Sequence, residues 1–330
     1  RAFARKHYQG FVCGSQGKLR RPMFLCLAAP GTGKSRTLNE FRGVLSAALR
    51  EKPSELFQTH EEYAEELAHR LSAAESCIQF NLTFENGCGY TANPDTDPVV
   101  AIVRRLLKQA AGFAKLESVD TMFDVTTWTP DRIFTEMARI KGLQPEEMTV
   151  IMCVDGLQKY SDGALHSRSS PAYQLVQFLA SMGNSATREA RSPFLVVCGA
   201  AITFGPDTAL GKSQQARCVF QPPALDPARI GEFDKWKQNR MVQLVLDDMQ
   251  GHGRALEAVY EALKQHPHFR NDQLYKHVIE TLKTLYTLPL TDSMISVLVA
   301  VLLGHRFQDP SSVIPNTQPP LTYALVRALM

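Results

Sequence analysis

Eight consecutive residues, from Ala28 to Ser35, have the composition and spacing of a phosphate-binding loop. Their letters, AAPGTGKS, match the pattern G-x-x-x-x-G-K-[ST], with Ala28, a small residue that still fits the tight turn, in place of the first glycine. Backbone N–H groups in such a loop converge on phosphate oxygens, and the helix that follows adds its positive end. We expect Lys34 to reach the β- and γ-phosphates of a nucleotide and the Ser35 hydroxyl to ligate Mg²⁺. The residues expected to contact the nucleotide are Pro30, Gly31, Thr32, Gly33, Lys34, Ser35 and Arg36.

A second Gly-Lys-Ser, at residues 211–213, provides an internal control for the first. It follows Thr208-Ala209-Leu210, with no strand pattern before it and no apolar helical pattern after it. The first copy directly follows the apolar run Met23–Ala28 and opens a helical pattern that extends from Lys34 to about Arg50. Because the motif binds phosphate between a buried strand and a helix, we expect binding at the first copy and not at the second.

A phosphate loop of this kind needs a carboxylate on a neighbouring strand to hold Mg²⁺. Asp155 ends the most apolar strand pattern in the chain, Thr149–Asp155, and is the expected Mg²⁺ ligand together with Ser35. Many related sites carry a glutamate directly after this aspartate as a general base, but here that residue is Gly156. Gln158 is a candidate to orient the attacking water, as a glutamine does in some GTPases; the alternative is a solvated loop residue. The missing base predicts slow hydrolysis.

Arg254 is the fourth catalytic candidate, beside Lys34, Asp155 and Gln158. A helical pattern ends at Gly251 and another begins near Arg254, with a Gly-His-Gly joint between them that we expect to be flexible. An arginine there can fold back onto the nucleotide and report its state; the alternative is a helix-start arginine in water. Thr203, after the fourth apolar run, is a candidate to sense the γ-phosphate.

Short apolar runs that alternate with helical patterns must position these residues. The expected strands are residues 23–28, 77–84, 149–155, 193–200 and a short 217–220. This alternation predicts an α/β fold with a parallel sheet and right-handed crossovers, and the near-continuous apolar character suits a sheet covered on both faces. Pro222-Pro223 marks a boundary, and the pattern is helical from Asp226 onward.

Composition narrows the class of protein. Apolar residues make up 44% of the chain and charged residues 21%, which is typical of a globular protein, and a net charge of +3 does not by itself argue for nucleic-acid binding. The seven cysteines include no C-x-x-C pair and indicate small buried side chains in a reducing compartment rather than zinc ligands. No apolar run reaches the ~18 residues of a membrane span. The chain begins with Arg1 and ends within a helical pattern, so we expect a piece of a longer protein whose targeting segment lies elsewhere.

With these parts assembled, the chain resembles the P-loop ATPase module of Crinkler effectors and retrotransposon-hot-spot-like proteins, with AAA- and STAND-like features. The resemblance covers about residues 11–265 and is carried by PMFLCLAAPGTGKSRTLNEF, TVIMCVD with the trailing Gln158, PFLVVCGA and GHGRALEAVYEAL. It implies a five-stranded parallel sheet in the order 5-1-4-3-2, then a helical lid and a partial winged-helix-like segment. The expected domains are an N-terminal extension (1–22), the P-loop NTPase core (23–223), the lid (224–288) and the C-terminal segment (289–330).

The resulting expectation is an enzyme that binds ATP with Mg²⁺ and hydrolyses it slowly, as a conformational switch or as the driver of an attached or partner domain. Two alternatives stay open: a nucleotide-bound scaffold that never hydrolyses, and a small-molecule P-loop kinase, against which the helical tail argues. The resemblance also implies a secreted effector that acts inside a host cell, in the nucleus in many family members, with nucleic acid or a host nuclear protein as partner. A homo-oligomer is left open, and no membrane partner is expected.

Overall fold

The structure is a computed structural model that describes residues 1–28, 31–50, 61–85, 97–160, 170–202, 205–249, 251–266 and 273–285. The chain forms two compact units. The first comprises Arg1–Ala28 and Lys34–Gln221, and the second comprises Ala29–Gly33 and Pro222–Met330. The backbone therefore passes from one unit to the other within the predicted phosphate loop.

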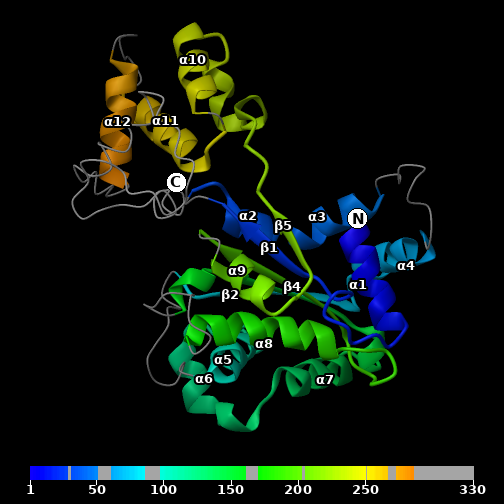
Figure 1. Ribbon diagram of the computed structural model, residues 1–330. Coiled ribbons are helices and arrows are strands. Elements are labelled where there is room, and N and C mark those ends of the chain that lie inside the picture. Colours follow the sequence, from blue (N-terminus) through cyan, green and yellow to red (C-terminus); the bar gives the residue numbers. More distant parts are fainter. Residues whose placement is uncertain are drawn as a thin grey trace. The chain divides into compact units, whose positions relative to one another are not determined.

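A five-stranded parallel sheet forms the centre of the first unit (Figure 1). Its strands are β1 (Met23–Leu27), β2 (Cys77–Thr83), β3 (Thr149–Asp155), β4 (Phe194–Ala201) and β5 (Arg217–Phe220). The order β2-β3-β4-β1-β5, with every pair parallel, is the predicted order 5-1-4-3-2 read from the other edge. The α/β prediction is thus confirmed, and β4 separates the strand that precedes the loop from the strand that carries Asp155.

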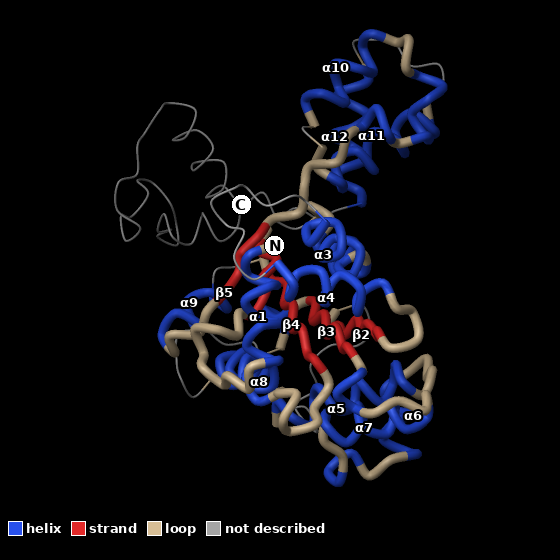
Figure 2. The backbone as a smooth tube through the Cα atoms, turned by 90° about the vertical axis from the view of Figure 1, so that its right-hand side faces the viewer, coloured by secondary structure: helices blue, strands red, loops and turns tan. Residues whose placement is uncertain are grey.

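Helices cover both faces of this sheet (Figure 2). One face packs against α5 (Pro98–Ala110), α6 (Leu116–Met122), α7 (Pro130–Ile140), α8 (Pro171–Ser185) and α9 (Gly205–Lys212). The other packs against α1 (Ala2–Val12), α2 (Lys34–Asn39), α3 (Phe41–Arg50) and α4 (Glu61–Ser72).

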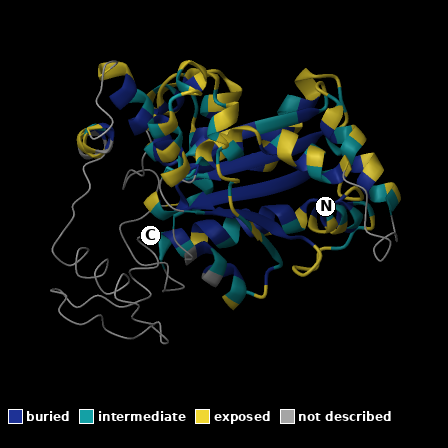
Figure 3. Ribbon diagram, turned by 90° about the horizontal axis from the view of Figure 1, so that it is seen from above, coloured by how far each residue is buried: buried dark blue, intermediate teal, exposed yellow. Residues whose placement is uncertain are grey.

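The strands carry apolar side chains on both sides because helices cover both faces of the sheet. Side chains alternate across a strand, so Leu25 of β1 enters one core and Phe24 and Cys26 enter the other. Every residue of β1 and β4 is buried, and Figure 3 shows the central strands as buried ribbons. Burial also raises the pKa of the Cys26 thiol to about 12, which keeps it protonated and unreactive, as expected of a small core side chain.

Two local features differ from the sequence pattern. The helical run after the loop is two helices, α2 and α3, divided at Glu40. The first 22 residues, expected as an extension, contain α1, whose His7, Tyr8 and Phe11 rings pack 5.0–5.3 Å from the ring of Phe194. Helix α1 is therefore part of a hydrophobic core of the first unit.

The second unit contains three α-helices among its described residues: α10 (Arg240–Asp248), α11 (Gly253–Gln265) and α12 (Leu274–Leu285). They share a separate core that includes Phe233, Val245 and Val259. The predicted winged-helix-like segment, 289–330, lies outside the described residues.

Short 3₁₀ helices occur in both units, at Val125–Thr127, Pro145–Glu147, Leu157–Lys159 (η4), Pro227–Arg229 and Gly231–Trp236. No helix within the described ranges is long and apolar enough to cross a membrane.

Candidate functional site

The predicted phosphate loop follows β1 directly and leads into α2. Strand β1 ends at Leu27, and Lys34 is the first residue of the helix. The Lys34 side chain is buried, 8% exposed, and its Nζ donates a 2.8 Å hydrogen bond to the carbonyl oxygen of Ala28. The ammonium group is therefore held beside the residue where the loop begins.

Gly31 and Gly33 adopt left-handed backbone angles, with φ of 79° and 89°. Residues with a Cβ rarely adopt this conformation, which explains both glycines of the loop. Thr32, between them, is half-buried, and Pro30 lies outside the described residues. Arg36 lies in α2 next to Ser35: its Nε pairs at 3.0 Å with Glu40, one helical turn later, and both side chains are exposed.

Ser35 and Asp155 meet. The Ser35 hydroxyl donates a hydrogen bond of 2.5 Å to Oδ2 of Asp155, although the two residues belong to different elements, α2 and the end of β3. Hydroxyl and carboxylate oxygens are ligands that Mg²⁺ prefers, and Mg²⁺ commonly takes one or two protein ligands and several waters. This pair of oxygens fits the ion. No cluster of three or more His, Cys, Asp or Glu that could hold a metal is found among the described residues.

Gly156 stands where many related sites carry a catalytic glutamate, and two structural features explain why the residue is glycine. Its φ is +75°, in the left-handed region, and it caps η4. A Cβ built on it would also lie 2.7 Å from Cγ and 3.4 Å from Oε1 of Glu85. The space in which a side chain at position 156 would begin is therefore filled by the Glu85 side chain.

Glu85 is an acid that the sequence argument missed. It follows β2 at the same edge of the sheet as Asp155, because Thr83 and Asp155 are paired in the β2–β3 register. Its Oε1 accepts a 3.0 Å hydrogen bond from Nε2 of Gln158. The signal that could have found it is its position: in parallel sheets, functional groups gather just beyond the carboxyl ends of strands.

Gln158 connects three strand ends. It follows β3, its amide group donates to Glu85 beyond β2, and its Oε1 accepts from the Ile202 backbone N–H beyond β4, at 3.4 Å. A backbone N–H can only donate and a carboxylate accepts, so these partners fix which end of the amide is oxygen. Thr203, the next residue after Ile202 and the predicted sensor, lies outside the described residues.

Arg254 is the second residue of α11, in the second unit. Its backbone N–H donates to the carbonyl of Gly31 at 3.3 Å, and its side chain lies where a Cβ on Gly31 would be. A Cβ on Gly253 would lie 2.8 Å from the same carbonyl, and one on Gly251 would overlap the backbone of Leu225. Both glycines thus permit close backbone packing, and the expected flexibility of the Gly-His-Gly joint stays a prediction.

The second Gly-Lys-Ser has a different environment from the first. Gly211 and Lys212 close the last turn of α9, and the Ser213 hydroxyl donates to the Leu210 carbonyl at 2.9 Å. A helix C-terminus presents carbonyl oxygens, not N–H groups, and therefore does not favour phosphate.

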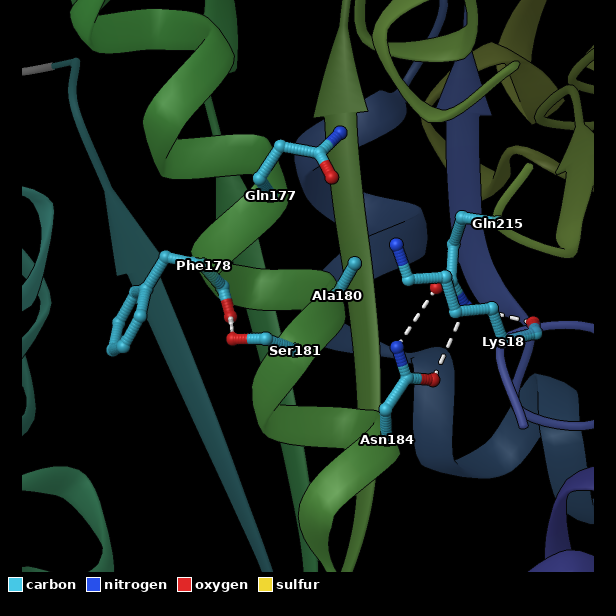
Figure 4. Close-up of a pocket in the computed structure, with 7 residues that line it drawn as sticks. All are labelled: Lys18, Gln177, Phe178, Ala180, Ser181, Asn184 and Gln215. Carbon is cyan, nitrogen blue, oxygen red and sulfur yellow. Dashed lines mark hydrogen bonds between the residues drawn. The ribbon is translucent and has the colours of Figure 1, made fainter. Parts of the chain in front are cut away.

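A separate pocket of about 310 Å³ lies beside α8 (Figure 4). Part of its polar lining is paired within the pocket: Asn184 donates to the side-chain oxygen of Gln215 at 2.8 Å, and Gln215 donates to the Lys18 carbonyl at 3.2 Å. None of the predicted site residues lines it, and its hydrogen bonds tie α8 to the segments before β1 and β5. The lining residues are Lys18, Gln177, Phe178, Ala180, Ser181, Asn184 and Gln215.

Comparison with known proteins found one kind of relative by sequence and one by structure. The chain is 32% identical over 276 residues to Crinkler effector protein 108 of Phytophthora sojae, a match that spans 81% of this chain and 30% of that protein. The resemblance to Crinkler effectors is thus confirmed at the level of sequence similarity. No protein-family model matches the chain.

Among solved structures, the chain is similar to the ORC2 protein of Aeropyrum pernix. The ADP form aligns with a TM-score of 0.44 at 15% identity, over 92% of this chain and 74% of that one. The ADPNP-ADP complexes align with a TM-score of 0.43 at 14% identity, over 93% and 75%. The assignment of the fold rests on the strand order of this chain's own sheet.

Proposed function

We propose that this chain binds ATP with Mg²⁺ through the loop Ala28–Ser35 and hydrolyses it slowly. The observation that carries the proposal is the 2.5 Å hydrogen bond between Ser35 and Asp155, two oxygen donors brought together from α2 and β3. A loop motif alone is a sequence pattern; its serine beside a strand-end carboxylate is the arrangement that a nucleotide-bound Mg²⁺ requires.

Each residue has a role in this proposal. Gly31, Gly33 and the start of α2 supply backbone N–H groups, and Lys34 supplies a buried positive charge. Ser35 and Asp155 would hold Mg²⁺, which when bound neutralises charge on the phosphate oxygens. Pro30, Thr32 and Arg36 are proposed neighbours of the nucleotide.

Slow turnover and a switching role follow from residues around the loop. No carboxylate directly follows Asp155, so the usual adjacent base is missing. Arg254 is proposed to meet the nucleotide in its triphosphate state; the support is that the N–H and side chain of Arg254 contact Gly31 of the loop. Binding and hydrolysis would then change how α11 engages the loop.

The biological setting is proposed from the relative. The chain spans about 30% of the length of the Crinkler effector that it matches, so we propose an ATP-driven module within a longer effector. Its proposed place of action is the host cell, including the nucleus, with nucleic acid or a host nuclear protein as client of the whole protein.

Binding of ATP by wild type, Lys34→Ala and Lys212→Ala, measured by calorimetry, tests the site. We expect Lys34→Ala to abolish tight binding and Lys212→Ala to leave it unchanged, because Lys212 closes a helix and does not open one. Unchanged affinity in Lys34→Ala would refute the proposed site. Single-turnover hydrolysis of labelled ATP then separates an ATPase from a scaffold, and transfer of the label to a small molecule would reveal a kinase.

A further inference from the structure

We propose that Glu85 supplies the catalytic carboxylate that takes the proton from the attacking water, and that Gln158 positions it. This inference rests on the proposed ATP hydrolysis and deepens it, because it names the base that the residue after Asp155 does not provide. It is carried by the contacts of the first unit around the carboxyl ends of β2, β3 and β4.

The backbone beside Glu85 is firmly anchored. The Phe84 N–H donates to the Asp155 carbonyl at 3.0 Å, and the Glu85 N–H donates to the Thr83 hydroxyl at 2.9 Å. The Phe84 ring is buried and lies between the Arg105 guanidinium, 3.9 Å from its centroid, and the Tyr160 ring, 5.0 Å away. The anchored backbone fixes the point from which the Glu85 side chain leaves the chain, which is one part of the preorganisation that catalysis needs.

The Glu85 carboxylate is held by Gln158, which lies beyond the end of the neighbouring strand β3. Gln158 donates to Oε1 at 3.0 Å and is fixed in turn by the Ile202 N–H. The carboxylate has further acceptor positions on both oxygens, since an ionised carboxylate has about four lone-pair sites. Glu85 is only half-buried, so water can reach it.

The carboxylate also lies where a base would be expected. Its Oε1 is 3.4 Å from the point at which a side chain on residue 156 would begin, directly after the proposed Mg²⁺ ligand Asp155. Glu85 thus brings from β2 the group that β3 lacks. A base that reaches the site from a neighbouring strand replaces only part of what an adjacent glutamate would contribute, so slow turnover remains the expectation.

The reaction balances as follows. The oxygen of water forms a bond to the γ-phosphorus of ATP while the bond between that phosphorus and the β–γ bridging oxygen breaks. The electron pair stays on the bridging oxygen, so ADP leaves. The water gives one proton to Glu85, which then releases it to solvent, and the products are ADP, inorganic phosphate and a proton. General-base assistance of this kind typically contributes ~10²–10⁴-fold to the rate.

The test compares two glutamates placed symmetrically about β2. Glu85 lies two residues after its end, and the exposed Glu75 lies two residues before its start. In Glu85→Gln we expect kcat to fall by ~10²-fold or more, with ATP affinity and the thermal unfolding midpoint close to wild type. Glu75→Gln should change none of the three. If Glu85→Gln does not fold, Glu85→Asp, which keeps the charge on a shorter stem, should fold and still lose most of the turnover.

Gln158 is tested by a double-mutant cycle. Gln158→Ala should lower kcat with little change in ATP affinity, and adding it to Glu85→Gln should cost nothing more, because a positioning residue acts through its partner. Additive losses would overturn the positioning role of Gln158. Wild-type turnover in Glu85→Gln would overturn the assignment of Glu85 while leaving the ATPase intact. No phosphate release by wild-type protein that binds ATP would overturn the proposed hydrolysis and this assignment together.

Discussion

The Ser35 hydroxyl donates a 2.5 Å hydrogen bond to Asp155, joining residues that are 120 positions apart in the chain. The contact reaches past β4, which lies between β1 and β3 in the sheet. It makes the end of β3 and the start of α2 one polar site at the edge of the sheet.

Removing either the Ser35 hydroxyl or the Asp155 carboxylate should abolish the effect of Mg²⁺ on ATP affinity. In Ser35→Ala and Asp155→Asn, the ratio of affinities with Mg²⁺ and with EDTA should fall toward one, because each variant loses a proposed metal ligand. Ser35→Thr keeps the hydroxyl and should retain the Mg²⁺ effect. Ser72→Ala, which removes an exposed helical hydroxyl bonded to the Ala68 carbonyl, is the control. An undiminished Mg²⁺ effect in Asp155→Asn would exclude Asp155 as ligand.

Gly156→Ala should destabilise the fold by more than Gly112→Ala. Both glycines have left-handed φ, +75° and +71°, so both variants carry a conformational cost of roughly 1–2 kcal/mol. A Cβ at Gly112 would meet nothing within 4 Å, whereas one at Gly156 would crowd Glu85. Urea unfolding measures both costs. Equal costs would mean that Glu85 does not occupy the space beside Gly156. Gly156→Glu should be destabilised likewise and should gain no turnover.

Arg254→Ala should impair hydrolysis, or ATP-driven closure, more than it impairs ADP binding. The reason is the proposed contact with the nucleotide in its triphosphate state only. Arg240→Ala is a matched control, because Arg240 is an exposed arginine that starts the neighbouring helix α10. ATP turnover and ADP affinity are measured on both variants. Equal weakening of ATP and ADP binding, or no effect on either, would contradict the prediction.

His7 should make the fold sensitive to mild acid. Burial, the larger cause, and the Arg21 charge lower the pKa of His7 to about 4, and its Nε2 donates to the Leu195 carbonyl at 2.7 Å. Above pH 6.5, His7 is neutral in both states and its contribution to stability is complete. Between pH 6.5 and 4 only the unfolded chain takes up the proton, so stability falls by up to about 1.4 kcal/mol per pH unit.

His7→Gln, which keeps a donor for Leu195, should show a shallower loss of stability over the same pH range. Denaturant unfolding at several pH values between 4 and 7 measures the difference between the two proteins. Parallel curves for wild type and variant would show that His7 takes up its proton equally in the folded and unfolded states.

The parallel sheet and the place of Asp155 were predictable because their signals are local: apolar runs alternate with helical patterns, and the loop motif is contained within residues 28–35. The strand order was implied by the resemblance to a known family, because local patterns do not fix which strands pair. The choice between the two Gly-Lys-Ser copies also needed only their neighbours in sequence.

The place of Glu85 just beyond the predicted strand 77–84 was a local signal, but its role, like that of helix α1, depends on tertiary contacts. Nothing near residue 85 in sequence reveals that its side chain lies against Gly156, 71 positions later. The close packing at Gly251 and Gly253 was hidden for a similar reason: a glycine needed for close packing and one needed for motion look the same in sequence. Helix α1 has an apolar stripe, but the residue that it packs against, Phe194, lies far away in the sequence, at the start of the fourth strand.

Steady-state phosphate release by the purified chain with ATP and Mg²⁺ is the decisive measurement for the proposed ATPase. We expect release that is measurable but slower than the ~10 s⁻¹ typical of enzymes, and that disappears in Lys34→Ala while persisting in Lys212→Ala. Turnover at tens per second without any partner would contradict slow hydrolysis. No release by the wild type, or equal release by Lys34→Ala, would contradict the claim that the loop Ala28–Ser35 is the site of an ATPase.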